Sequence, residues 1–197
     1  MPKDWIAYRL ALLIADQRGR FRKSGGPWDR AVRVALLLDL VQLGRVSLLG
    51  NGSLVDTTPT GFLPADTLIA YVYEHPTGSM LDLFGSAPIG LAAMAVNQAS
   101  RRFSRYDVGD VDPDEAAAEK DRVREVALGE PVDSEATAIL AILADSLFLT
   151  VLNKDLELAA HCGGHAPLVV ECANYLRAQA EQAAISAAMP GTVGGGG

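Results

Sequence analysis

The apolar residues of this chain fall into long blocks that predict buried helices. One block covers residues 4–16, and a second, residues 30–43, is apolar on almost every side. A third block, residues 135–152, is interrupted only by a few polar residues. A helix that is apolar on nearly every face has to be buried. We therefore expect the core to be centred on the 30–43 and 135–152 helices.

Capping residues and glycines predict where these elements begin and end. Asp29 is expected to cap the second helix and Gly44 to end it. In the segment 45–57, two short stretches flank Gly50-Asn51-Gly52. These glycines can supply the positive φ values of a tight turn, so the segment predicts a β-hairpin. Residues 75–90 are expected to form a loop. Further helices are expected over residues 65–74, 91–102 and 167–188, and after the acidic starts at 112–115 and 131–135.

These elements predict a mostly helical, all-α fold with one small β-hairpin near residues 45–57. A chain of 197 residues is long enough for one domain with its own core. We expect that single domain to span residues 1–190, with a flexible glycine-rich tail at 191–197. The third apolar block is short and contains polar residues, so it favours a buried helix over a membrane span.

Cysteine usage and the N-terminus favour a cytoplasmic protein. The chain has two cysteines, Cys162 and Cys172, which is too few for a secreted disulfide scaffold. Charged residues interrupt the first apolar block, so it does not have the pattern of a secretion signal. They are Asp4, Arg9 and Asp16.

The net charge of −7 is unevenly distributed along the sequence. Residues 1–105 carry 12 Lys and Arg against 8 Asp and Glu, a balance of +4, whereas residues 106–197 carry 5 against 16, a balance of −11. Within the first part, residues 17–33 hold six Lys and Arg against one Asp. An acidic protein with one basic segment is a poor general binder of nucleic acid, but it can hold an anion locally.

The basic segment is the strongest candidate binding site. Guanidinium groups, the backbone N–H groups of Gly25-Gly26 and a helix N-terminus are all suited to phosphate. The predicted anion or headgroup site consists of Arg18, Arg20, Arg22, Lys23, Trp28 and Arg33. The alternative is a solvated loop that balances the acidic second half. Arg33 interrupts an apolar helix, so it needs either a ligand or a carboxylate partner in an internal ion pair.

Other motifs do not predict catalysis. The spacing of His161, Cys162, His165 and Cys172 is not that of a zinc finger or knuckle, so helix packing of small cysteines is favoured and no metal is expected. A Cys–His nucleophile would need a group that orients the histidine, and no adjacent residue of the sequence would do so. The sequence has no serine-hydrolase, P-loop or dinucleotide motif, so we expect neither a cofactor nor an enzymatic activity.

Four segments, in their order along the chain, resemble the bacterial branch of the Golgi phosphoprotein 3 family. They are Leu-Ile-Ala-Asp-Gln-Arg-Gly-Arg ending at residue 20, and the segments 37–46, 55–61 and 132–147. The resemblance implies an all-helical, peripheral membrane protein that holds a phosphoinositide headgroup through a tryptophan and several arginines.

The same resemblance assigns some of the site residues. Arg33 falls on a family arginine, whereas the family's tryptophan falls on Ser24, four residues before Trp28. Two later basic positions of the family fall in residues 87–94, which contain no arginine. A secondary basic site is predicted nearby, at Arg101, Arg102 and Arg105.

Two functions remain open from the sequence. The first is a non-catalytic, adaptor-like protein bound peripherally to the inner face of a membrane through anionic phospholipid headgroups. The alternative is a soluble interaction or regulatory subunit that binds a protein partner and no lipid. Neither function involves nucleic acid.

Overall fold

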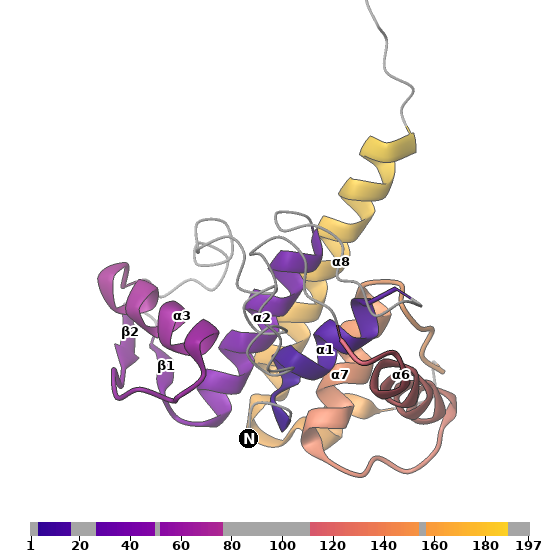
Figure 1. Cartoon of the computed structure of the whole chain (residues 1–197), viewed down its shortest axis with the longest axis horizontal. Coiled ribbons are helices and arrows are strands. Elements are labelled where there is room, and N and C mark those ends of the chain that lie inside the picture. Colours follow the sequence, from indigo (N-terminus) through magenta and orange to yellow (C-terminus); the bar gives the residue numbers. More distant parts are fainter. Residues whose placement is uncertain (1–3, 17–26, 50–51, 77–110, 154–156, 189–197) are drawn as a thin grey trace, which may run out of the picture.

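The structure, a computed structural model, describes residues 4–16, 27–49, 52–76, 111–153 and 157–188 (Figure 1). The fold is mostly helical with one two-stranded antiparallel hairpin, which confirms the predicted fold class. The elements in chain order are α1 (Ile6–Ile14), α2 (Pro27–Gln42), β1 (Val46–Leu49), β2 (Gly52–Val55), α3 (Leu63–Glu74), α6 (Pro113–Leu128), α7 (Glu135–Ser146), the 3₁₀ helix η2 (Leu158–His165) and α8 (Ala166–Ala188). The helix expected over residues 91–102 and most of the 75–90 loop lie outside the described ranges.

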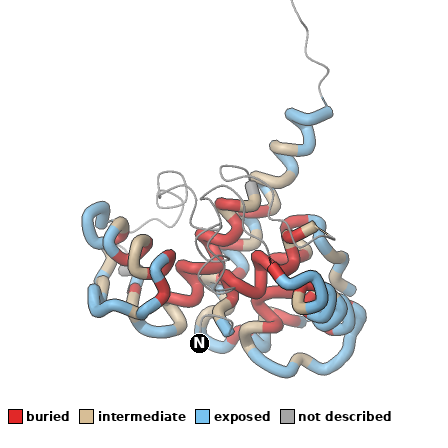
Figure 2. The backbone as a smooth tube through the Cα atoms, in the orientation of Figure 1, coloured by how far each residue is buried: buried red, intermediate tan, exposed pale blue. Residues whose placement is uncertain are grey.

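The core forms around α1, which packs against both α2 and α7, while α8 packs against α2 and α7, and α6 packs against α1 and α7 (Figure 1). Every residue from Ala31 to Leu40 is buried, and so is most of α7 (Figure 2). The predicted central position of these two helices is therefore confirmed. The C-terminal part of α8 projects from the body and is largely exposed (Figure 2). In the part of the chain that the structure describes, no helix is both long and apolar enough to cross a membrane.

The start of α2 differs from the prediction. The helix begins at Pro27, because proline suits a first turn in which its missing N–H is not needed. Asp29 is consequently not the cap but a residue of the first helical turn, and it is fully buried. The predicted end is correct: Gly44 has φ +67°, and the N–H of Arg45 donates to the carbonyl of Leu40 at 2.8 Å.

The third predicted helix ends earlier than expected. Instead of running to Leu152, α7 stops at Ser146, and Phe148 has a left-handed φ of +57°. The backbone N–H of Leu152 donates to the carboxylate of Asp145 at 3.1 Å, so the chain folds back on the last turn of α7. The remaining apolar residues of the block form a turn.

Several other boundaries agree with the sequence signals. The side chain of Asp112 accepts the N–H of Asp114 at 2.9 Å and caps α6. Ser134 caps α7 by accepting the N–H of Thr137 at 3.2 Å. In the hairpin, Gly52 pairs with Leu49 across the strands, so it belongs to β2 rather than to the predicted turn.

Buried polar contacts tie α1 to α6 and α7. Arg9 donates from Nε to Glu119 at 2.9 Å and from its terminal nitrogen to the Thr137 hydroxyl at 3.0 Å. At the other end of α1, the Lys120 ammonium donates to the carbonyl of Ala15 at 2.6 Å. These contacts fix α6 along the length of α1.

Candidate functional site

Most of the predicted anion site cannot be compared with the structure. Its four N-terminal cations, Arg18, Arg20, Arg22 and Lys23, lie outside the described residues, and so does the predicted secondary site of Arg101, Arg102 and Arg105. Trp28 and Arg33 are described, both on the first half of α2. Trp28 is half-buried and packs against the core.

Arg33 forms the internal ion pair that the sequence left open. Its Nε lies 3.4 Å from Oδ2 of Asp29, one helical turn earlier, and both side chains are buried. Burial lowers the pKa of Arg33, while the Asp29 carboxylate and two tyrosines oppose that shift. The neighbouring Arg30 donates to Gln179 of α8. Arg33 is therefore buried in the core and paired with Asp29 within α2. That it also binds an anionic ligand stays a prediction.

The His and Cys residues of the C-terminal region do not converge. His165 pairs with Glu135, Nδ1 to Oε1 at 2.9 Å, whereas Cys162 and Cys172 are free and fully buried. Burial raises the pKa of the Cys162 thiol to about 11 and that of Cys172 to about 12, so both stay protonated at neutral pH. Within the described ranges, no three His, Cys, Asp or Glu side chains gather in a way that could hold a metal.

The turn after α7 exposes apolar side chains that the sequence placed inside a helix. We call residues 148–152 the apolar turn. Phe148 is 57% exposed and Val151 82%, and Leu149 is also exposed. Leu128, at the end of α6, is exposed as well, and the N–H of Asn153 donates to the carbonyl of its neighbour Ala127 at 3.0 Å. These exposed apolar side chains make the turn a candidate interaction site.

A polar anchor holds the apolar turn in this conformation. The Asp145 carboxylate accepts both the Leu152 N–H and the guanidinium of Arg177 from α8. That guanidinium lies over the Phe148 ring, 5.7 Å from its centroid, which is within the range of a cation–π contact. Phe148 is thus fixed at a positive φ that a bulky residue rarely adopts.

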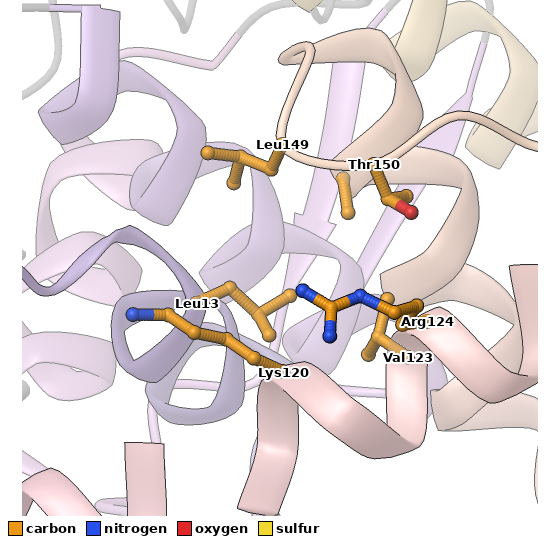
Figure 3. A pocket seen from close by; sticks show the side chains of 7 residues that line it. Leu13, Lys120, Val123, Arg124, Leu149 and Thr150 are labelled. Carbon is orange, nitrogen blue, oxygen red and sulfur yellow. The ribbon is translucent and has the colours of Figure 1, made fainter. Parts of the chain in front are cut away.

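A small pocket lies against the apolar turn. Its volume is about 100 Å³, and Figure 3 shows Leu149 and Thr150 of the turn facing Leu13, Lys120 and Arg124. Val123 and Ala144 complete the wall. The pocket therefore combines two cations of α6 with aliphatic side chains from α1, α6, α7 and the turn.

Two larger hollows have acidic linings. One, of about 280 Å³, is lined by Asp39 with Asp4 and Trp5, but the Asp39 carboxylate is used by backbone N–H groups of α1. The other, of about 220 Å³, lies between α3 and the segment before it and includes Asp66, which accepts from Thr60. Among the three hollows, the one beside the apolar turn suits an anion best.

Sequence reasoning missed the apolar turn for an identifiable reason. The run from Ala136 to Leu152 has helical composition to its end, and Phe148 gives no local sign of a left-handed conformation. Two features of the sequence could have indicated that the helix ends early. They are the length of the apolar run and the polar cluster Asn153-Lys154-Asp155 that follows it, which is typical of a turn.

Comparison with known proteins gives no relative from which a function could be transferred. No protein-family model, no curated protein and no solved structure matches the chain. The resemblance to the Golgi phosphoprotein 3 family thus stays a prediction from the sequence.

Proposed function

We propose that this protein associates peripherally with anionic membrane surfaces and acts as a binding module rather than an enzyme. The observation that carries the proposal is the apolar turn, in which Phe148 and Val151 extend into solvent beside the cations of α6 and α8. Apolar side chains that enter the lipid interface, together with nearby basic residues, are the two components of peripheral membrane binding.

The strained backbone of Phe148 supports a role for its ring. A left-handed conformation costs a residue with a Cβ about 1–2 kcal/mol, and glycine would avoid that cost. Here the strain keeps an aromatic ring exposed instead of burying it. Strain of this kind persists where the surrounding structure imposes it and is found most often at functional sites.

The basic segment of the sequence adds the electrostatic part of the proposal. Lys120 holds the carbonyl of Ala15, which is two residues before Gln17, where the basic segment begins. Leu13 of the pocket wall precedes the start of the basic segment by four residues in the sequence. Each Lys or Arg near an anionic surface contributes about 1 kcal/mol, and the proposal keeps Arg18, Arg20, Arg22 and Lys23 as the cations that the sequence assigns to membrane binding.

Co-sedimentation with vesicles tests the proposal. Vesicles of phosphatidylcholine, with and without phosphatidylglycerol, are compared at low and high salt. The expected result is binding to the anionic vesicles that weakens with salt, because exposed charges are screened. No binding to either vesicle would favour the soluble protein-interaction subunit instead, whereas equal binding to both would contradict the electrostatic part of the proposal.

Paired variants show whether the apolar turn is responsible. Val151→Ser removes an exposed apolar side chain from the turn, and Ile185→Ser removes one from the projecting part of α8. Burying such a side chain fully is worth about 1.5–3 kcal/mol, so Val151→Ser should weaken binding roughly tenfold or more. Ile185→Ser should bind as the wild type does.

A further inference from the structure

The pocket beside the apolar turn has the lining of a phosphate subsite. We propose that it binds the phosphate group of a membrane phospholipid and does not recognise the remainder of the headgroup. The inference rests on the proposed membrane association and specifies what the lipid contributes at this face. It is based on the lining of the pocket, in which Lys120 and Arg124 occur together with the apolar side chains of Leu13, Val123 and Leu149.

The two cations line the same pocket from α6, with the Arg124 guanidinium extending into it and the Lys120 ammonium pointing away from that guanidinium toward the Ala15 carbonyl (Figure 3). Lys120 and Arg124 are four residues apart on α6, so they lie one above the other on the same face of the helix. Figure 3 shows the Arg124 guanidinium extending between Leu13 and the side of the pocket that carries Thr150. A guanidinium recognises a phosphate with two parallel N–H donors, and an ammonium adds a point charge.

Both cations keep donors available for an anion. Lys120 uses one of its three N–H groups for the carbonyl of Ala15, and Arg124 contacts Asp121 at 3.3 Å. That ion pair is about two-thirds exposed on both sides, and exposed pairs of this kind are worth about 0–1 kcal/mol. A phosphate can therefore compete for Arg124 without a large loss of stability.

The size of the pocket limits what it can recognise. Its volume is about 100 Å³, whereas pockets that enclose a whole small molecule measure about 300–1,000 Å³. One phosphate fits that space, but a sugar headgroup would have to remain outside. The pocket therefore favours a ligand read through its phosphate alone.

The aliphatic wall indicates a lipid as the source of that phosphate. Leu149 lines the pocket and also belongs to the exposed apolar turn. A phosphate bound beside Lys120 and Arg124 would leave its attached hydrocarbon next to Leu149 and the other apolar side chains of the turn. Inorganic phosphate has no group that could use this wall.

The decisive experiment compares two arginines of the same helix. Arg124→Gln removes a cation that lines the pocket, whereas Arg122→Gln removes one whose contacts are with Glu119 and Asp133, at 3.8 Å and 4.0 Å. Both variants lose one charge from α6, so the long-range field changes alike. In co-sedimentation with phosphatidylglycerol vesicles, Arg124→Gln should bind about tenfold more weakly than the wild type. Arg122→Gln should stay within about twofold of it, as expected for an exposed charge under salt screening.

Two further arms identify the ligand. Vesicles with equal fractions of phosphatidylglycerol or phosphatidylinositol carry the same charge and should bind the protein equally. A preference between them that disappears in Arg124→Gln would contradict recognition of the phosphate alone. Inorganic phosphate, added at constant ionic strength, should not displace the protein. Full displacement would show a site for free phosphate and overturn the lipid assignment.

The outcomes separate this inference from the function on which it rests. If the wild type does not bind anionic vesicles, both proposals are wrong. If it binds them and Arg124→Gln weakens binding no more than Arg122→Gln does, membrane association stands and the phosphate subsite is wrong. Circular dichroism and thermal unfolding of the two variants exclude a folding defect as the cause of a difference.

Discussion

The carboxylate of Asp39 caps a helix to which it does not belong. From the last turn of α2 it accepts the backbone N–H of Ile6 at 2.8 Å and that of Ala7 at 2.9 Å, in the first turn of α1. The cap residue of α1, Trp5, has no side-chain hydrogen bond to offer these groups. A residue 33 positions away in the sequence therefore satisfies donors that would otherwise be buried without acceptors.

Removal of this cap should destabilise the protein strongly. Asp39→Ala leaves two backbone N–H groups of α1 without their acceptor in a buried position, and each such group costs about 1–3 kcal/mol. We expect a loss of about 2–6 kcal/mol of unfolding free energy from the same costs, measured by urea denaturation. Asp66→Ala, which removes a carboxylate that holds Thr60 near the surface, is the control and should cost less.

The same carboxylate should give the stability a distinctive pH dependence. Burial raises the pKa of Asp39 from 3.8 to about 7, against the opposing effect of its two backbone hydrogen bonds. A raised pKa means that the folded state holds a proton that the unfolded state releases. The contribution of Asp39 is thus fully present below about pH 4 and is lost as the pH rises through 7.

This dependence can be isolated with Asp39→Asn, which keeps an acceptor but cannot ionise. Between pH 5 and 7, the unfolding free energy of the wild type should fall relative to that of the variant by up to about 1.4 kcal/mol per pH unit. Parallel curves for the two proteins over this window would show that Asp39 has a normal pKa.

The buried pair of Arg9 and Glu119 should depend on both partners being present. Arg9→Met leaves the Glu119 carboxylate in a site where little of it reaches solvent, so we expect a loss of about 3–5 kcal/mol. The double variant Arg9→Met/Glu119→Met should be much more stable than that single variant, because it leaves no buried charge behind. Urea denaturation of the three proteins measures this coupling, and additive losses would contradict it.

Phe148→Gly should separate stability from binding. Glycine adopts the left-handed conformation of residue 148 without strain, which offsets the lost contact with Arg177. We therefore expect a change in unfolding free energy within about 1 kcal/mol, together with clearly weaker binding to anionic vesicles. A large loss of stability would instead assign the ring a structural role.

The basic segment and Arg33 should respond differently to substitution. The triple variant Arg20→Ala/Arg22→Ala/Lys23→Ala should weaken binding to anionic vesicles about a hundredfold, at about 1 kcal/mol per charge. Arg33→Ala removes the ion-pair partner of the fully buried Asp29, so its main effect should be about 3 kcal/mol of lost stability. Thermal unfolding and vesicle binding of both variants test this contrast.

The sequence predicted the fold well where the signals are local. Asp112 and Ser134 cap their helices because the cap requires only a short polar side chain just before the first turn. Gly44 ends α2 because its positive φ needs no tertiary support. The continuous apolar run of α2 placed that helix in the core, since no face of it could remain in water.

Only the tertiary structure determined the contacts between elements that are far apart in the sequence. Asp29 is a residue type that favours helix caps. Because α2 begins at Pro27, however, Asp29 lies inside the first turn and is the buried ion-pair partner of Arg33. The apolar run after α7 has helical composition throughout, but Asp145 and Arg177, 32 residues apart, turn it outward at Phe148. Composition and spacing thus determined which segments are helical and buried. They could not determine where the polar side chains of one helix meet the backbone of another, because those contacts form only when the packed core brings the elements together.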